Sequence, residues 1–205
     1  MSKLWKIIEL IFLFIALPVL MKFNIIPLPR LLSLMIVFGF VLFISIRLKY
    51  LDRNWYKLPT LDSKYWLKMG LTYLASFLFF IAYIYFFLGE KPFILLRERP
   101  HLMIIISIFY PLFSAFPQEV IYRSFFFERY KNIFTTKYLL ISNMLAFSFL
   151  HIIYNNLPAL ILTLISSLVF TLNYQKKRSL MLVTIEHSIL GLIVFITGMG
   201  RYFYK

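Results

Sequence analysis

Four side chains in the second half of the chain could carry chemistry: Glu119, Arg123, His151 and His187. Glu119 and Arg123 lie four residues apart in the largely apolar run FPQEVIYR, residues 116–123. On a helix this spacing places both charges on one face, one turn apart. Charged groups at bilayer depth normally pair, face the bundle interior and mark a functional site. The alternative interpretation is an ion pair that only locks two helices together.

The two histidines lie in later apolar runs, His151 near the end of one and His187 inside the last. Glu119 precedes the polar turn at 132–137 by thirteen residues, and His151 follows it by fourteen. An antiparallel hairpin therefore brings these two side chains to one level, with His187 slightly nearer the surface. We expect Glu119, Arg123, His151 and His187 to line one buried polar cavity. Separately, each histidine could instead be a hydrogen-bond partner between helices.

A carboxylate and two imidazoles around one cavity suit the activation of a water molecule. Arg123 would favour the ionised form of Glu119 against desolvation. Carboxylate oxygen and imidazole nitrogen are also normal zinc ligands. The chain contains no HExxH motif, however, so zinc-protease chemistry by that route is unsupported. We expect no metal and no cofactor.

The composition indicates the class of protein that holds these residues. Of the 205 residues, 61% are hydrophobic and 20% aromatic, whereas soluble domains are about 45–50% apolar. Long apolar runs recur, which is typical of an integral membrane protein. The chain has no cysteine, which excludes disulfides and thiol catalysis. The predicted fold is an all-α polytopic membrane helical bundle.

The apolar runs predict seven transmembrane helices, at about 4–20, 31–46, 69–88, 101–131, 138–154, 157–173 and 180–197. The run at 101–131 exceeds one bilayer thickness and contains Pro117. Proline removes a helix hydrogen bond and clashes with the preceding turn, so this run is one bent helix or two short ones. The second possibility gives eight spans. Residues 47–68 and the tail 198–205, both rich in aromatic and basic residues, are expected at the membrane interface.

We divide the chain into N-terminal transmembrane helices with an interfacial segment, residues 1–100, and a catalytic core, residues 101–205, within one membrane domain. With a cytoplasmic N-terminus, fourteen basic residues lie inside and seven outside, which the positive-inside rule favours. The net charge of +14 lies between the apolar runs and therefore predicts contact with anionic lipid head groups. We expect membrane lipids as partners and no nucleic acid.

Three short motifs occur in order on successive helices: QExxxR at 118–123, FxxxH at 147–151 and HxxxG at 187–191. This set resembles EExxxR, FxxxH and HxxxN or HxxxD of the CPBP membrane proteins, which include CAAX prenyl proteases and bacteriocin-processing or self-immunity proteins. The resemblance covers about residues 109–200 and does not include the first hundred.

The resemblance implies a glutamate-dependent intramembrane endopeptidase with a helical bundle around a polar cavity. It implies that Glu119 and His151 activate water, that His187 stabilises the oxyanion and that Arg123 holds the glutamate. A peptide or lipidated protein is the implied substrate. The implied location is the bacterial cytoplasmic membrane, as a multi-pass protein.

Two positions depart from the family pattern. Gln118 replaces the first glutamate of the pair, and an amide cannot accept a proton at neutral pH. We therefore expect Glu119 to be the general base and Gln118 to support it as a hydrogen-bond donor. Gly191 replaces the Asn or Asp and removes an oxyanion donor. Asn155, one turn past His151, and Asn143 are the expected substitutes.

Three functions follow from these residues. The first is an active intramembrane CAAX-like endopeptidase. The second is a catalytically impaired family member that acts by binding, for example in self-immunity to a bacteriocin. The third is a small transporter or assembly factor with a structural ion pair, although the chain shows no internal repeat of the kind that transporters carry.

Overall fold

The computed structural model describes residues 2–51 and 55–204, and these contain helices and no strands. Seven of the helices within these residues are long and apolar enough to cross a membrane. The all-α polytopic bundle predicted from the sequence is therefore confirmed. The seven spans are Lys3–Lys22, Arg30–Arg47, Ser63–Phe87, Pro100–Tyr130, Thr136–Tyr154, Leu157–Lys177 and Leu180–Thr197.

Most spans are single helices, and the others change their hydrogen-bond pattern along their length. The single ones are α3 (Arg30–Arg47), α4 (Ser63–Phe87), α10 (Leu157–Lys177) and α11 (Leu180–Thr197). The first span joins α1 (Lys3–Ile11) to α2 (Leu17–Lys22) through a π-helical segment. The fifth joins α9 (Thr136–Leu150) to a 3₁₀ turn, His151–Tyr154. Short helices α5 (Ile94–Glu98) and Met199–Phe203 lie between or after the spans.

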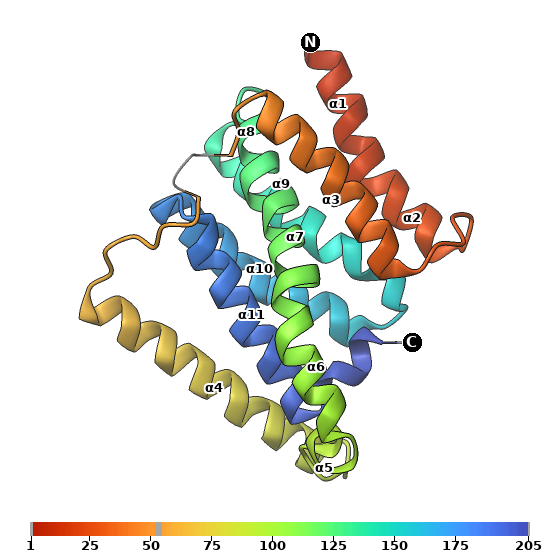
Figure 1. The fold of residues 1–205 in the computed structure, drawn as a ribbon, viewed down its shortest axis with the longest axis vertical. Helices are drawn as coiled ribbons and strands as arrows, with labels where there is room; N and C mark the ends of the chain where they lie inside the picture. The colour runs from red at the N-terminus through yellow and green to blue at the C-terminus, as the bar shows by residue number, and fades with distance from the viewer. Residues whose placement is uncertain (1, 52–54, 205) are drawn as a thin grey trace.

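The long fourth span is one continuous helix that Pro117 does not divide. It runs through α6 (Pro100–Tyr110), α7 (Phe116–Glu119) and α8 (Phe126–Tyr130), with π-helical segments at Pro111–Ala115 and Val120–Phe125 (Figure 1). In a regular helix the ring of Pro117 would clash with the carbonyl of residue 113. That carbonyl lies in the first π segment, where the wider turn accommodates the ring. Of the two alternatives predicted for residues 101–131, one helix or two short ones, the structure shows one helix.

Side-chain caps fix where three of the site-bearing or supporting helices begin. Asp62 accepts from the Tyr65 amide at 2.8 Å, Asn156 from the Ala159 amide at 2.9 Å and Ser179 from the Leu182 amide at 3.2 Å. Each oxygen satisfies an amide that has no partner within its helix. The starts of α4, α10 and α11 are therefore determined locally.

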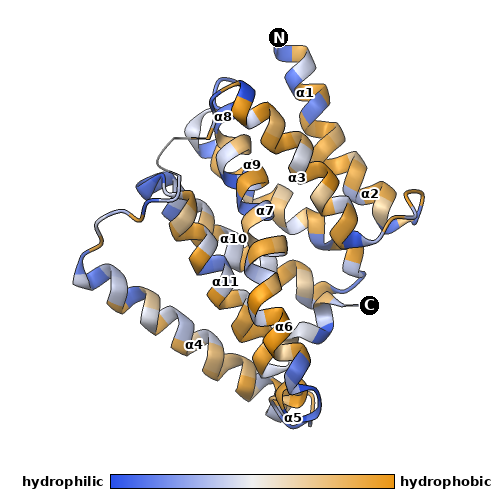
Figure 2. Cartoon of the chain, viewed as in Figure 1, coloured by the Kyte–Doolittle hydropathy of each residue, from blue (hydrophilic) through white to orange (hydrophobic). Residues whose placement is uncertain are grey.

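The core of the bundle is aromatic and surrounds the second half of the long helix. The ring of Phe14 on the first span makes edge contacts with Tyr122 and Phe126 at centroid distances of 5.3 and 5.0 Å. The outward faces are apolar as well, with Phe86 76% and Phe87 79% exposed on α4. In Figure 2 hydrophobic colour predominates on most helices, α4 is mixed, and strong hydrophilic colour occurs at helix ends and in loops. Such an exposed apolar surface fits contact with lipid.

The segments that the charge pattern assigns to the cytoplasm meet at one end of the bundle. There Arg178 pairs with Glu128, and the Ser179 hydroxyl donates to the Lys57 carbonyl at 3.1 Å. At the other end, Arg201 pairs with Glu90 at 2.6 Å. Arg53 and Lys205, two residues of the charge count, lie outside the described residues. Which end faces the cytoplasm stays a prediction.

Helix α4 is tied to α11 and α10 by the buried carboxylate of Glu186. Its Oε1 accepts hydrogen bonds from the Tyr65 hydroxyl and, at 2.8 Å, from the Asn173 amide. Glu186 is 1% exposed, so these donors replace the water that it loses on burial. This acid directly precedes His187 and serves to hold α4 against the helix that carries that histidine.

Candidate active site

The carboxylate of Glu119 lies at the centre of the polar residues in the bundle. Its Oε1 is 2.8 Å from Nδ1 of His187, and its Oε2 is 3.2 Å from Nε of Arg123. Glu119 and Arg123 are both fully buried. A buried carboxylate without partners would carry a large desolvation penalty, which the guanidinium and the imidazole offset together.

Arg123 is held from all sides, so it fixes the orientation of the carboxylate. Its Nη1 donates to Oδ1 of Asn143 at 3.0 Å and its Nη2 to the Ser167 hydroxyl at 3.5 Å. The guanidinium lies 5.0 Å from the ring centroid of Phe147 and 5.9 Å from that of Phe170. These contacts combine hydrogen bonds with cation–π attraction in a dry environment.

His187, from the middle of α11, presents one ring nitrogen to Glu119 and the other away from it. An ionised carboxylate only accepts hydrogen bonds, so Nδ1 of His187 donates to Glu119 and Nε2 is the ring nitrogen that faces away from it. The imidazole stacks on Phe170, with centroids 4.9 Å apart and planes 22° apart. The hydrogen bond and the stacking together fix both the tautomer and the plane of His187.

His151, at the junction of α9 and the 3₁₀ turn, is oriented in the same manner. Its Nδ1 is 2.9 Å from the carbonyl oxygen of Phe147. A carbonyl only accepts, so Nε2 is the unprotonated nitrogen of the neutral ring. The rings of His151 and His187 both lie against Phe147, at centroid distances of 5.2 and 5.6 Å. Two imidazole acceptors are thereby placed around one phenylalanine.

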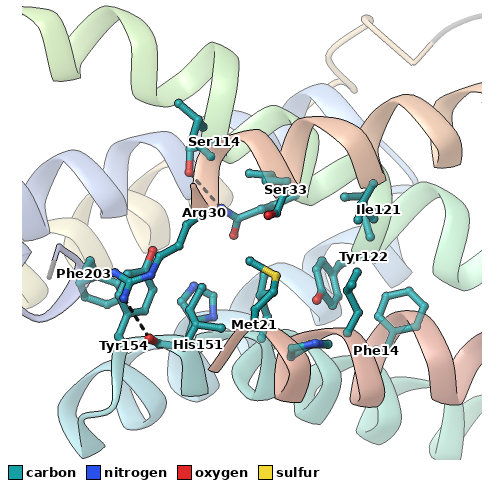
Figure 3. Close-up of a pocket in the computed structure, with 18 of the residues that line it drawn as sticks. Phe14, Met21, Arg30, Ser33, Ser114, Ile121, Tyr122, His151, Tyr154 and Phe203 are labelled. Atoms are coloured by element: carbon teal, nitrogen blue, oxygen red, sulfur yellow. Dashed lines mark hydrogen bonds between the residues drawn. The ribbon is translucent and has the colours of Figure 1, made fainter. Parts of the chain in front are cut away.

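Two cavities meet at these residues. The first, called here the α3 cavity, has a volume of about 450 Å³ and is bounded by α2, α3 and the long helix (Figure 3). The second, the α4 cavity, has a volume of about 490 Å³ and is bounded by α4, α10 and α11. Five residues line both of them: Ser114, Gln118, His151, Tyr154 and Phe203. The polar centre therefore lies in the wall between two mostly apolar spaces.

The four residues expected in one cavity are close together, but they lie in two layers. His151 lines both cavities and His187 lines the α4 cavity. Glu119 and Arg123 line neither, because they lie behind His187. Contact between Glu119 and a water stays a prediction. Glu119 reaches the cavity through the imidazole of His187.

Gln118 occupies the position that faces both cavities. Its Nε2 donates to the Ser114 hydroxyl at 3.0 Å, and its side chain lies in the shared wall. The two neighbouring residues of the QE motif thus have opposite roles in space. The amide faces the cavities, and the carboxylate faces the protein interior.

The two asparagines expected to replace the missing side chain at 191 lie elsewhere. Asn143 is fully buried, where its Oδ1 accepts from Arg123 and Thr171 and its Nδ2 donates to the Tyr122 carbonyl. Asn155 is exposed, lines neither cavity and has a φ of 54°. A left-handed asparagine of this kind ends a helical turn.

Residues that the sequence did not single out complete the site. Phe203, from the tail expected at the membrane interface, lines both cavities and lies 6.0 Å from the His151 ring. The amide of Asn156 donates to the Tyr202 carbonyl at 2.9 Å and holds this tail in place. Arg30 lies over the ring of Tyr154 at 5.0 Å and donates to the Ile153 carbonyl at 3.2 Å (Figure 3).

No group of three or more histidine, cysteine or acidic side chains suited to a metal occurs within 2–51 and 55–204. Nδ1 of His187 contacts Oε1 of Glu119, and Oε2 of Glu119 contacts Arg123. The polar side chains that line the cavities carry imidazole, amide or hydroxyl groups, together with the guanidinium of Arg30. Such groups can bind and orient a water molecule and a peptide carbonyl.

Comparison with known proteins assigns this part of the chain to a family. No curated protein and no solved structure matches the sequence. Residues 100–193 match the family described as type II CAAX prenyl endopeptidase Rce1-like, and this stretch carries Gln118, Glu119, His151 and His187. The chain is a multi-pass membrane protein by its helices. The match confirms the resemblance to the CPBP membrane proteins, and residues 100–193 are similar to the Rce1-like family of CAAX-type intramembrane proteases.

Proposed function

We propose that this protein is an intramembrane endopeptidase that cleaves a membrane-associated or prenylated peptide or protein with a water activated by Glu119, His187 and His151. The observation that carries the proposal is the 2.8 Å contact between Glu119 and His187 in the wall of the α4 cavity. A carboxylate that orients an imidazole beside a substrate-sized space is a common arrangement for proton transfer.

In this proposal His187 is the general base and Glu119 acts through it. Nε2 of His187 takes a proton from water while the water oxygen bonds to the scissile carbonyl carbon. The Glu119 carboxylate stabilises the resulting imidazolium. Collapse of the tetrahedral intermediate breaks the carbon–nitrogen bond, and Nε2 returns the proton to the leaving amine. Arg123 holds the carboxylate in place through its contact with Oε2.

His151 and Gln118 would position the reactants. The unprotonated Nε2 of His151 can accept the second hydrogen of the attacking water, since its Nδ1 is engaged with the Phe147 carbonyl. Gln118 has a further amide hydrogen beyond the one donated to Ser114. It can donate to the backbone of a bound peptide. Correct placement of a water and a carbonyl contributes a large part of the rate acceleration in such reactions.

The two cavities support an apolar substrate on both sides of the scissile bond. The α3 cavity is lined by Leu13, Phe14, Leu17, Met21 and Val37, among others. The α4 cavity is lined by Phe79, Phe80, Ile165 and Val169, among others. Apolar side chains or a lipid chain of the substrate would keep their apolar contacts on moving from the bilayer into these two cavities. This is the reason for proposing a membrane-associated or prenylated substrate.

Cleavage by the intact chain in liposomes tests the proposal. The substrates are a peptide with a farnesylated cysteine near its C-terminus and the same peptide without the lipid, and the products are identified by mass spectrometry. We expect cleavage by the natural chain and a loss of about 10²–10⁴-fold in Glu119→Gln. Glu9→Gln, which alters a carboxylate outside the site, is the matched control. Equal rates in both variants would contradict the proposed site.

One observation favours a second candidate, a binding protein on the same scaffold. The cavity-facing position next to Glu119 is an amide, Gln118, where the resemblance predicts a carboxylate. A protein that only binds would retain a labelled farnesyl peptide uncut and would bind it equally well after Glu119→Gln. Binding without products in the natural chain and in Gln118→Glu would favour this function.

A further inference from the structure

Tyr110 occupies the space that Gly191 leaves on α11. A Cβ atom added to Gly191 would overlap the hydroxyl and Cε1 of Tyr110. The phenol therefore rests directly on the glycine backbone. Any side chain at position 191 and the present position of Tyr110 exclude each other, so these two residues form a complementary pair.

The Tyr110 ring is held between two residues of α11 that lie on the same face as Gly191. His187, Gly191 and Phe195 are spaced four residues apart on α11. The ring centroid of Tyr110 is 6.0 Å from that of His187 and 5.4 Å from that of Phe195, with both contacts edge-to-face. Such contacts hold the ring in a defined orientation. The hydroxyl end lies against Gly191, one helix turn from the proposed base.

Tyr110 also lines the α4 cavity together with His187 and Gly191. Its hydroxyl takes part in no hydrogen bond within residues 2–51 and 55–204. Three further hydroxyls on the cavity wall are engaged with backbone oxygens, whereas within residues 2–51 and 55–204 those of Ser76, Ser114 and Tyr154 donate to none. Thr163 donates to Ala159 at 2.7 Å, Ser166 to Thr163 at 3.2 Å and Thr72 to Lys68 at 2.9 Å.

The ring N–H groups of the site are engaged as well. Nδ1 of His187 faces Glu119, and Nδ1 of His151 faces the Phe147 carbonyl. A tetrahedral intermediate formed near Nε2 of His187 needs a hydrogen-bond donor for its negative oxygen. A neutral phenol is such a donor and keeps its proton throughout the reaction.

We propose that the Tyr110 hydroxyl is the oxyanion donor of this site and substitutes for a side chain that Gly191 lacks. The inference deepens the proposed endopeptidase function and rests on it. It makes Tyr110 a catalytic residue that would contact the reacting carbonyl oxygen. It also explains why neither Asn143 nor Asn155 needs to reach the cavity.

Tyr110→Phe removes the donor and retains the ring on the glycine. We expect kcat for the farnesyl peptide to fall by about 10²–10³-fold, the usual effect of removing one oxyanion donor. KM should change by less than about threefold, because the donor acts mainly in the transition state. Tyr174→Phe is the matched control, since this buried tyrosine lines neither cavity.

A paired exchange tests the complementarity itself. Gly191→Asn alone should lower thermal stability, because the new side chain overlaps Tyr110. Tyr110→Ala should lose activity, and Tyr110→Ala with Gly191→Asn should recover at least about tenfold of kcat by returning a donor to the same space. Recovery of activity by two substitutions that are each harmful alone cannot come from a purely structural role.

The outcomes distinguish this inference from the function on which it rests. Absence of cleavage by the natural chain would overturn both. Cleavage that Tyr110→Phe leaves within about threefold would overturn the inference and retain the protease. A change in KM alone, or an equal loss in Tyr174→Phe, would show that the tyrosine contributes packing rather than an oxyanion contact. A kcat loss confined to Tyr110→Phe supports the proposal.

Discussion

Two arginines of the long helix Pro100–Tyr130 pair with an acid, and the two pairs differ in burial and in the position of the acid. In one, Arg123 pairs with Glu119 within the same helix, at 3.2 Å, and both are fully buried. In the other, Arg129 reaches across to Glu9 on the first span through two contacts, at 2.8 and 2.7 Å. The second pair has the better hydrogen-bond geometry, because the guanidinium binds the carboxylate with two nitrogens.

The residues around each carboxylate explain which pair belongs to a site. Glu9 also accepts from the Tyr130 hydroxyl at 3.0 Å, so its oxygens hold three donors of the core. Glu119 instead faces an imidazole whose other side borders a cavity. A buried ion pair is thus weak evidence of function by itself. The histidine between the carboxylate and the cavity makes the difference.

The largest expected effect is a loss of kcat that occurs on substitution of Glu119 but not of Glu9. Glu119→Gln should lower kcat by about 10²–10⁴-fold, because His187 loses the charge that stabilises its protonated form. Glu9→Gln should change kcat by less than about threefold. Single-turnover cleavage in liposomes measures both. A double variant Glu119→Gln, His187→Ala that loses no more than either single variant would show that the two residues act as one unit.

His151→Ala should have the next largest effect. We expect kcat to fall by about 10²-fold, because the attacking water loses one of its two imidazole contacts and its position becomes less defined. His101→Ala, which changes a histidine outside both cavities, is the control. A loss in His151→Ala that matches the His101→Ala value would remove His151 from the site.

Glu9→Gln should have its main effect on stability. Glu9→Gln replaces the carboxylate that accepts both Arg129 contacts with a neutral amide, and we expect a loss of about 1–3 kcal/mol in unfolding free energy. The carboxylate is 17% exposed, so the loss should be below that of a fully buried pair. Thermal denaturation in detergent measures it. An unchanged midpoint would show that Tyr130 and Tyr50 compensate for the lost charge.

Gln118→Glu should have the smallest effect. If His187 is the base, a second carboxylate on the cavity wall is not required, and kcat should change by less than about tenfold. The same assay provides the measurement. A gain of 10²-fold or more would instead show that position 118 carries the base and that the natural amide impairs the reaction.

Much of the fold followed from hydropathy alone. The seven apolar runs correspond to the seven spans within a few residues at each end, because lipid-facing helices are apolar over their whole length. The scarcity of charged residues made Glu119 and Arg123 visible. The motif order then led to the family that residues 100–193 match.

The arrangement within the site could not be predicted from the same pattern. The spacing of Glu119 and Arg123 shows that they share a helix face, but it does not show whether that face borders a cavity or the interior. The contact of Tyr110 with Gly191 depends on how two distant helices pack, and an apolar pattern carries no signal for it. The tail that contains Phe203 was expected at the membrane interface because it is rich in aromatic and basic residues. That composition does not indicate that the 3₁₀ turn after Gly198 brings Phe203 to the site.

The π-helical segment Pro111–Ala115 has a consequence for how the site can tolerate change. A π turn contains about one residue more than an α turn, and one residue corresponds to about 100° of rotation around a helix axis. If the same number of residues formed regular α turns, Gln118 and Glu119 would be rotated by about that angle away from His187, with Tyr110 in place. Deletion of one residue together with the π turn would instead keep their orientation. The angular setting of the site is thus encoded by the number of residues between Tyr110 and Gln118 as well as by their types.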